Sequence, residues 1–389
     1  MYQSINFATP SVIFGMGSIN QTGAEAAKLG AKRALLVTGP NVQKSGSVDR
    51  AVDSLRASGI ETEVKVEARN TPEPATRIAE EVSVFAREMG ADCVIGLGGG
   101  SVLDVAKMSA ALVINPLRVR DYFGKEKLPA RGIPTIMIPT TSGTGAEVTK
   151  HAIFLDEETS VKKAVASTNL LPNTAIIDPM LTVSCPPAVT ASAGIDAFMH
   201  AAEPFVSKAA NPITDNLSLN AIALIAKWIG PAFADGDNLD ARYYMSLGSL
   251  MAGMVLNNAG TSLVHALAYP IGGEYHINHG RSLTPIMLAC FDYIMVAKQD
   301  KFILMAEALG ENVKGLAPYE AAQLCLKSLK ALLRRLDLPV CLNDLDITDK
   351  SKVDRWAVDA HAEQRLLSRC ARTLTVDDIK KIYLASFSA

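Results

Sequence analysis

Short apolar runs alternate with amphipathic stretches through the first half of the chain. Runs rich in Leu, Val, Ile and Cys predict buried strands, and apolar residues recurring every three or four positions predict helices between them. The predicted strands cover residues 34–38, 61–66, 93–97, 134–138 and 175–178. The predicted helices cover residues 48–57, 73–89 and 101–113. Alternation of this kind indicates an α/β fold with a parallel, doubly wound sheet.

The pattern changes after about residue 184, where strand signals nearly vanish and helical periodicity dominates. Pro186 and Pro187 form a helix-start signal at this boundary. The predicted helices cover residues 189–207, 214–228, 241–258, 262–270, 300–309 and 319–336. We therefore expect an α/β domain over residues 1–183 and an all-helical domain over residues 184–389.

Composition excludes several classes of partner. The 389 residues suit about two domains, and a net charge of −2 gives no global field that favours nucleic acid or an anionic membrane. No apolar run approaches ~18 residues, so we expect no membrane span. Six cysteines without a CxxC pair, and an N-terminus unlike a signal peptide, predict a cytoplasmic protein.

Two polar loops follow predicted strands. Gly98-Gly99-Gly100-Ser101 lies between a strand and a helix, where bare backbone N–H groups can hold a pyrophosphate. The Thr-, Ser- and Gly-rich segment 139–147 follows the next strand. Either loop alone could be a simple turn. Two of them at neighbouring strand ends favour a ligand site, because open α/β sheets bind ligands at that edge.

Histidines gather in the second half of the chain. Asp196 and His200 have the i,i+4 spacing that puts both on one helix face, and His265, His276 and His279 follow in a short segment. A single histidine is usually a core or surface residue, but this group could hold Fe, Zn, Mn or Co. Spacing does not choose between His276 and His279.

Matching motifs run from about residue 10 to residue 385, and with them the chain resembles the iron-containing (group III) alcohol dehydrogenase family. The motifs are Phe14-Gly-Met-Gly17, Gly98–Ser101 with Asp104 and Lys107, Pro139–Thr149, Leu171-Pro172, Ala175–Pro179, Gly194–Ala201, Val264–Ala268 and His279-Gly280. The resemblance implies a dehydroquinate synthase-like fold: a dinucleotide-binding domain, then an all-helical metal domain, with the active site between them.

The resemblance also implies a ligand set, cofactors and an activity. The implied metal ligands are Asp196, His200, His265 and His279, of which His279 is preferred over His276 because it precedes Gly280. Fe(II) is the implied metal, with Zn or Mn as alternatives. The implied NAD or NADP contacts are Asn70, Gly98, Gly99, Gly100, Ser101, Asp104, Thr140, Thr141, Thr149 and Lys162.

We expect an alcohol dehydrogenase or aldehyde reductase that acts on a small alcohol or aldehyde. The alternative is a hydroxyacid–oxoacid transhydrogenase, which turns over two acids without added nucleotide. Residues 5–13 look like a strand that could pair across a homodimer or a higher homo-oligomer, as the resemblance suggests.

Three departures from the family pattern affect the expected chemistry. Tyr269 stands where many members have a proton-relay histidine, so the relay could use Tyr269, His276 or His151. Gly39 replaces a carboxylate that would repel a 2′-phosphate, which makes NADP(H) admissible. Lys150 and Arg281 could hold a carboxylate, sulfonate or phosphonate on the substrate, or could be solvated or structural.

Overall fold

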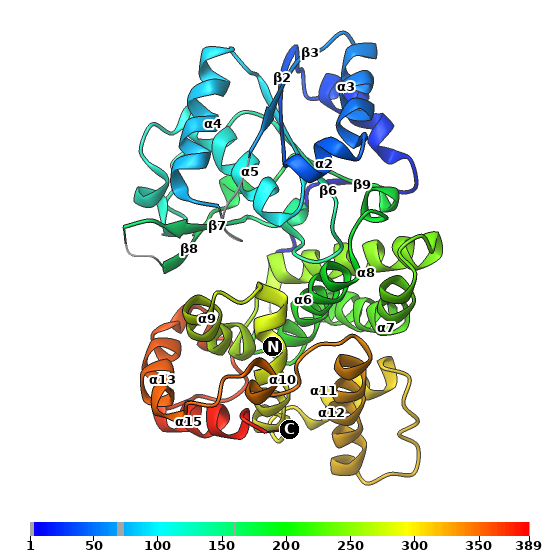
Figure 1. Ribbon diagram of the computed structural model, residues 1–389, viewed down its shortest axis with the longest axis vertical. Helices are drawn as coiled ribbons and strands as arrows, with labels where there is room; N and C mark the ends of the chain where they lie inside the picture. The colour runs from blue at the N-terminus through cyan, green and yellow to red at the C-terminus, as the bar shows by residue number, and fades with distance from the viewer. Residues whose placement is uncertain (1–3, 68–73, 159–160, 389) are drawn as a thin grey trace. The chain divides into compact units, whose positions relative to one another are not determined.

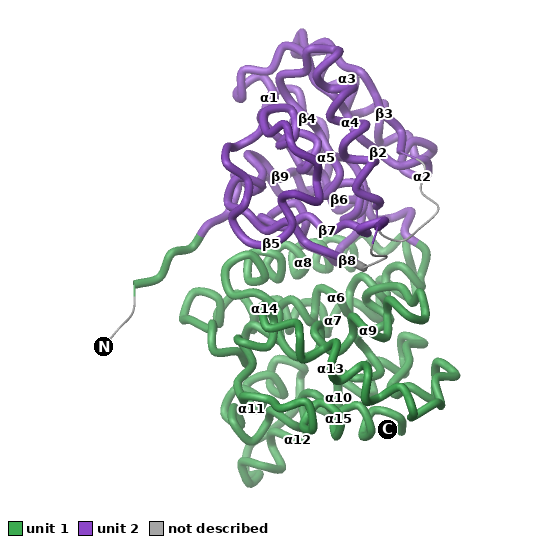
Figure 2. Tube along the Cα trace, turned by 90° about the vertical axis from the view of Figure 1, so that its left-hand side faces the viewer, with its two compact units in different colours: residues 1–7, 186–389 green, residues 8–185 purple. Residues whose placement is uncertain are grey.

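The computed structural model describes residues 4–67, 74–158 and 161–388. The chain divides into two compact units, which Figure 2 colours separately. One unit comprises residues 8–185, and the other comprises residues 1–7 and 186–389.

A parallel sheet of six strands forms the centre of the unit of residues 8–185 (Figure 1). Every pair of neighbouring strands in it is parallel, which confirms the predicted α/β sheet. In spatial order the strands are β1 (Ser11–Phe14), β9 (Thr174–Ile177), β6 (Thr135–Pro139), β4 (Cys93–Gly98), β2 (Arg33–Thr38) and β3 (Glu61–Val66).

Both faces of the central strands are buried, because alternate side chains of β2, β4 and β6 enter different cores. Leu35 and Val37 of β2 pack on one face with α4 (Thr76–Glu88) and α5 (Gly100–Ile114). Ala34 and Leu36 pack on the other face with α1 (Thr22–Lys28) and α3 (Ser47–Ala57). The near-continuous apolar runs that predicted the strands are therefore explained by burial on both sides.

A second, smaller sheet contains three strands that the sequence pattern did not reveal. β7 (His151–Asp156) and β8 (Val161–Ala166) form an antiparallel hairpin, and β5 (Gly124–Lys125) pairs with β8 in parallel. Charged residues such as Lys162 and Lys163 interrupt the apolar alternation of this hairpin, which explains why it was missed.

The unit that contains residues 186–389 is helical throughout its described part, as predicted. One core runs through it, and its largest buried side chains include Phe198, Phe205, Phe291 and Trp356. The helices are α6 (Pro187–Phe205), α7 (Pro212–Ala234), α8 (Leu239–Ala259), α9 (Leu263–Tyr275), α10 (His279–Met295), α11 (Gln299–Ala308), α12 (Pro318–Arg335), α13 (Val353–Ala362), α14 (Gln364–Leu367) and α15 (Val376–Ala385).

Helix α7 is the one helix in the described part of the chain that is long and apolar enough to cross a membrane. This is weak evidence, because core helices of water-soluble proteins meet the same criterion. Ile222, Ile225 and Ile229 of α7 enter the core of the helical unit, and Asp215 forms an ion pair with Lys301 at 2.6 Å.

Several elements differ from the sequence-based predictions, and three of them bear on the site or on the proposed dimer strand. The N-terminal strand covers Ser11–Phe14 and pairs with β9, whereas the described residues before it form no regular element. Helix α9 continues through Pro270 to Tyr275, because tertiary packing of its apolar face outweighs the one backbone hydrogen bond that proline removes. Helix α10 was not predicted, since its first turn contains His279 and Gly280, which are poor helix formers.

Candidate functional site

The two predicted loops lie side by side at the carboxyl ends of neighbouring strands. Gly98 of β4 is in register with Pro139 of β6, and the N–H of Thr140 donates to the carbonyl of Gly98 at 3.0 Å. A Cβ on Gly100 would lie 2.6 Å from Oγ1 of Thr144, so only glycine allows the two loops to approach this closely. Helix α5 begins at Gly100 without a side-chain cap or an acidic residue in its first turn, which leaves its N-terminal N–H groups suited to an anion.

Several predicted nucleotide contacts lie in or beside these loops. Asp104 and Thr149 are buried, whereas Ser101 and Thr141 are half-buried. Asp104 already accepts a hydrogen bond from the N–H of Ile153 at 3.0 Å. Asn70, another predicted contact, lies outside the described residues. The structure therefore brings the two glycine- and threonine-rich loops together and gives Asp104 a structural role.

Lys107 fastens the end of the threonine-rich loop to α5. Its fully buried ammonium lies 3.0 Å from Oδ1 of Asp104 and donates to the carbonyls of Thr149 and His151. Three oxygen partners compensate the cost of burying the charge. His151, a predicted relay residue, thus contributes its backbone to the start of β7.

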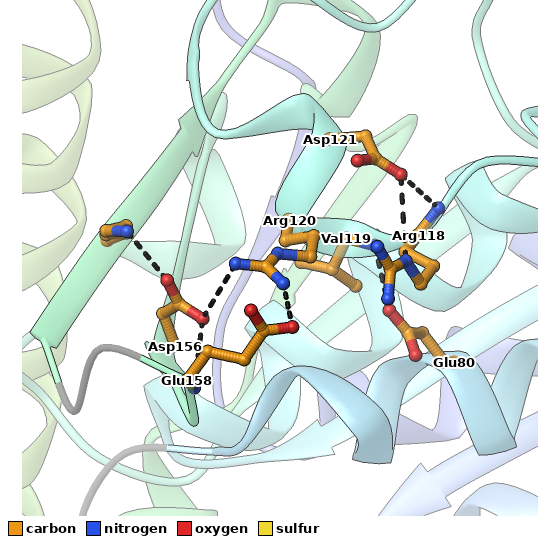
Figure 3. A network of polar contacts seen from close by, with 8 residues as sticks. Glu80, Arg118, Val119, Arg120, Asp121, Asp156 and Glu158 are labelled. Carbon is orange, nitrogen blue, oxygen red and sulfur yellow. Dashed lines mark hydrogen bonds and ion pairs between the residues drawn. The ribbon is translucent and has the colours of Figure 1, made fainter.

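Lys162, the predicted cofactor lysine, lies on the β7–β8 hairpin. Its neighbour Lys163 forms an ion pair with the buried carboxylate of Asp156 at 2.6 Å, and alternation along the strand puts Lys162 on the opposite face. Figure 3 shows Arg120 between Asp156 and Glu158. These contacts tie the hairpin to the turn at Val119–Tyr122, so the orientation of Lys162 is set by the hairpin.

Gly39, which replaces the expected carboxylate, lies just after β2. A Cβ there would meet the nearest side-chain atom, on Val102, at an ordinary contact distance of 3.7 Å. Its φ of −106° is open to any residue. Local packing therefore does not require glycine at this position. Lys44, at the end of α2 (Pro40–Lys44), is exposed.

In the helical unit, three histidines converge on one carboxylate oxygen. Oδ1 of Asp196 lies 3.3 Å from Nε2 of His200, 3.7 Å from Nε2 of His265 and 3.6 Å from Nε2 of His279. Asp196 and His200 share α6, His265 lies on α9, and His279 begins α10. Asp196, His265 and His279 each offer a ligand atom within 4.8 Å of the others. Three helices thus present four potential ligands to one point.

His276 takes no part in this arrangement. It caps α9 in the left-handed conformation, with φ of 53°, and its side chain is exposed. The structure therefore places His279, the residue that the family resemblance favoured, beside Asp196.

The spacing of these atoms fits a shared cation better than direct hydrogen bonds. Two ligand atoms that are each about 2.1 Å from a tetrahedral ion lie roughly 3.4 Å apart. Oδ1 of Asp196 and Nε2 of His265 are buried and have no hydrogen-bond partner among the residues that the structure describes. Buried polar atoms rarely lack a partner, and a metal ion would supply one. The side chain of His279 is 31% exposed, so one side of the cluster is accessible, as in catalytic sites.

Charge interactions within the cluster shift the pKa values of Asp196 and His265 in the direction opposite to the effect of burial. Burial alone would raise the pKa of Asp196, but the histidines around it hold that pKa well below its usual value. Burial would likewise lower the pKa of His265, but Glu203 and Asp196 raise it to about 9. The cluster therefore combines an ionised carboxylate with imidazoles that it draws toward positive charge, which is a setting that suits a cation.

Tyr269 lies beside the cluster, with its ring centroid 6.4 Å from that of His279. Burial raises the pKa of Tyr269 above its ordinary value of 10.0, against a lowering by the nearby positive charge of Arg365. The Tyr269 hydroxyl is therefore protonated at neutral pH. Arg365, on α14, was not found from the sequence, because only the tertiary fold brings it to Tyr269.

The two predicted substrate cations have other neighbours. Arg281 follows His279 by two residues, about 200° round α10, and its guanidinium is directed at the carbonyl of Asp337 at 3.5 Å. Lys150 lies in the unit of residues 8–185, where its charge lowers the pKa of Glu126, although backbone and hydroxyl hydrogen bonds from Thr168 contribute more to that shift. The geometry of α10 thus directs Arg281 away from the cluster.

Comparison with known proteins gives a match for each of the two units. A family model described as iron-containing alcohol dehydrogenase matches residues 9–179, and the C-terminal model of the Fe-containing alcohol dehydrogenase family matches residues 190–387. The chain belongs to the iron-containing alcohol dehydrogenase family. It is accordingly an oxidoreductase that acts on CH–OH groups.

Individual relatives of this enzyme cover nearly its whole length. Long-chain-alcohol dehydrogenase 1 of Geobacillus thermodenitrificans is 40% identical over 96% of the chain and 94% of that protein. The crystal structure of a 1,3-propanediol oxidoreductase matches with a TM-score of 0.94 and 34% identity, over 99% of this chain and all of the other. The sulfoacetaldehyde reductase of Bifidobacterium kashiwanohense, solved with NAD+, matches with a TM-score of 0.89 and 26% identity over the full length of both.

Proposed function

We propose that this dehydrogenase is an NAD(P)-linked, Fe(II)-dependent alcohol dehydrogenase or aldehyde reductase that acts on small substrates. The observation that carries the proposal is the convergence of three imidazole Nε2 atoms on Oδ1 of Asp196 at 3.3–3.7 Å. Imidazole and carboxylate ligands suit Fe(II), and also Zn(II) and Mn(II). The transhydrogenase alternative is not favoured, because the similar proteins are dehydrogenases and reductases.

In this proposal Asp196, His200, His265 and His279 hold the metal ion. When bound, the ion supplies a Lewis acid that polarises the alcohol or carbonyl oxygen. Three neutral imidazoles and one carboxylate leave a divalent site with a net positive charge, which favours an oxygen ligand that carries negative charge.

The loops that begin at Gly98 and Pro139 are the proposed dinucleotide site. Glycine backbone and the N-terminus of α5 would bind the pyrophosphate, and the threonine hydroxyls and Lys162 would orient the rest of the cofactor. NAD(H) is supported by the NAD+ complex of the similar sulfoacetaldehyde reductase. NADP(H) stays admissible, because Gly39 contributes no carboxylate there.

Tyr269 is the proposed proton donor beside the substrate oxygen. A guanidinium has only N–H donors, so the nearby Arg365 cannot accept the hydroxyl hydrogen of Tyr269. The hydroxyl hydrogen of Tyr269 then remains to be donated elsewhere. His276 and His151 remain the alternative relay residues.

An anionic substrate is a more specific version of the same proposal. A sulfoacetaldehyde reductase is among the similar structures, and the positive charge of Arg365 acts on Tyr269, which lies beside the cluster. Arg365 is therefore a better placed cation for a sulfonate, phosphonate or carboxylate than Arg281, whose guanidinium is directed at Asp337.

The test is aldehyde reduction with added Fe(II) under anaerobic conditions, with NADH and NADPH in parallel. The panel contains glycolaldehyde, propanal, succinate semialdehyde, sulfoacetaldehyde and phosphonoacetaldehyde. Turnover that depends on Fe(II) supports the proposal, and a higher kcat/KM for the charged aldehydes supports an anionic substrate. Absence of turnover with every aldehyde, at full metal loading, would contradict it. A homodimer and a cytoplasmic location remain predictions.

A further inference from the structure

A buried carboxylate outside the four proposed ligands contacts the cluster. Glu203 lies on α6, seven residues after Asp196, so the two share one face of that helix. One oxygen of Glu203, Oε2, contacts Nδ1 of His265, and the other, Oε1, accepts the N–H of Val264 at 2.6 Å. Glu203 and His265 are both buried. Both oxygens of this carboxylate therefore interact with groups of helix α9.

The contact with His265 determines which ring nitrogen carries hydrogen. An ionised carboxylate has only acceptor atoms, so Nδ1 of His265 must be the donor. In the neutral imidazole the lone pair then resides on Nε2, which is the atom that faces Asp196. The same ring that lacks a hydrogen-bond partner on Nε2 is thus held in the tautomer that can bind a metal ion.

The contact with Val264 fixes the beginning of α9. The N-cap residue, Ser262, makes no side-chain capping bond, so the first N–H groups of the helix need another acceptor. Glu203 supplies it from α6, and a negative charge is favourable at a helix N-terminus. Arg369 donates a hydrogen bond to the carbonyl of Thr261 at 3.3 Å. Burial lowers the pKa of Arg369, and the negative charge of Glu203 acts in the opposite direction.

We propose that Glu203 is a positioning residue for the metal centre. It holds His265 in the Nδ1–H tautomer with Nε2 directed at Asp196, and it fixes the end of α9 from which His265 projects. This inference rests on the proposed metal site and goes beyond its four ligands. Carboxylates that orient a ligating histidine typically contribute a factor of about 10–100 to metal affinity.

The test compares Zn(II) affinity, measured by chelator competition, in the full-length wild type and in Glu203→Gln. The amide oxygen can accept from only one of the two N–H donors, and the amide NH2 opposes the other. We expect the dissociation constant for Zn(II) to rise about 10–100-fold. Glu203→Asp keeps the charge and both acceptors, so it should bind Zn(II) more tightly than Glu203→Gln. Glu274→Gln, the same change near the other end of α9, should leave the affinity unchanged.

A second measurement reads the tautomer directly. Selective 15N labelling of the six histidines in the protein without Zn(II), at about pH 10 where the ring is neutral, should show the His265 ring protonated at Nδ1. The Nε2–H form would overturn the inference even if Glu203→Gln does not fold. An affinity of Glu203→Gln within about twofold of wild type would overturn it as well, provided that His265→Ala loses Zn(II). Retention of Zn(II) by His265→Ala would instead contradict the metal site on which the inference rests.

Discussion

Oδ1 of Asp196 lies 3.6 Å from Nε2 of His279, although the two residues belong to different helices. Asp196 lies in the middle of α6, and His279 is the first residue of α10. With His265 on α9, the cluster joins three helices of one unit. A metal ion at this point would therefore act both as part of the chemistry and as a link within the helical core.

Removal of one ligand should abolish metal binding and the stability that depends on it. We expect His265→Ala to contain little metal and to lose aldehyde reduction. Zn(II) should stabilise the wild type by roughly 3–4 kcal/mol at 100–1,000 times its dissociation constant, and should leave His265→Ala unchanged. Metal analysis and thermal unfolding with and without chelator measure both effects. His276→Ala, which alters an exposed histidine outside the cluster, should retain its metal. Full metal occupancy in His265→Ala would refute the ligand assignment.

Metal affinity should fall as the pH falls. The pKa of His265 is raised to about 9 by Glu203 and Asp196, and a protonated imidazole cannot bind a metal ion. Below pH 9 a proton must leave before the metal binds, so the affinity should drop by up to about tenfold per pH unit. Chelator competition with Zn(II), at several pH values between about 6 and 9, gives the slope. An affinity that does not change over this range would show that His265 is not a ligand.

The alternation of strands and helices was predictable, because it depends on local burial. β4, for example, is buried along its whole length and ends at Gly98, where the chain turns into α5. The β7–β8 hairpin was not predictable, since Lys163 interrupts its apolar pattern and finds its ion-pair partner, Asp156, only across the hairpin. Ala152, Phe154 and Val165 of this hairpin do enter the core, but the charged residues between them hide that pattern in the sequence.

Some residues of the candidate site were likewise predictable from the sequence, and others were not. Asp196 and His200 could be placed on one helix face from their spacing, but spacing left His276 and His279 as alternatives. The turn that follows α9 decides between them, because it leaves His276 exposed and starts a new helix at His279. Glu203 has a signal in the sequence, seven residues after Asp196 on the same helical face. Arg365 has none, because its contact with Tyr269 depends on how α14 packs.

The buried carboxyl of Glu147 should make the unit of residues 8–185 less stable as the pH rises. Burial raises the pKa of Glu147 from 4.5 to about 7, against a lowering by Lys107. A raised folded-state pKa stabilises the protein below pH 4.5, and this contribution is lost as the pH rises toward 7. The shift corresponds to about 3 kcal/mol in the free energy of unfolding.

Glu147→Gln should remove this pH dependence. Denaturant unfolding of both proteins at about pH 5 and pH 7 gives the difference, with Glu157→Gln, an exposed site, as the control. An equal pH dependence in wild type and Glu147→Gln would contradict the prediction.

Tyr269 should contribute to turnover without contributing to metal binding. Tyr269→Phe keeps the ring beside His279 but removes the hydroxyl. Loss of a positioned proton donor typically costs about 10²–10⁴-fold, so we expect kcat to fall at least about tenfold while the metal content stays at the wild-type level. Tyr269→His, which restores a group able to donate and accept protons, should recover part of the loss.

Arg365→Gln tests whether the orientation of the Tyr269 hydroxyl matters for turnover, because this change keeps the hydroxyl that Tyr269→Phe removes. A guanidinium can only donate hydrogen bonds, whereas the amide of glutamine can also accept one. In Arg365→Gln the Tyr269 hydroxyl hydrogen can therefore turn toward residue 365 instead of toward the substrate. We expect a smaller decrease in kcat than in Tyr269→Phe, and no further decrease when both changes are combined, because the two residues act as one unit. Arg355→Gln, at an exposed arginine paired with Glu274, is the matched control and should leave kcat unchanged. Independent, multiplying effects of Tyr269→Phe and Arg365→Gln would show that Arg365 acts on the substrate rather than through Tyr269.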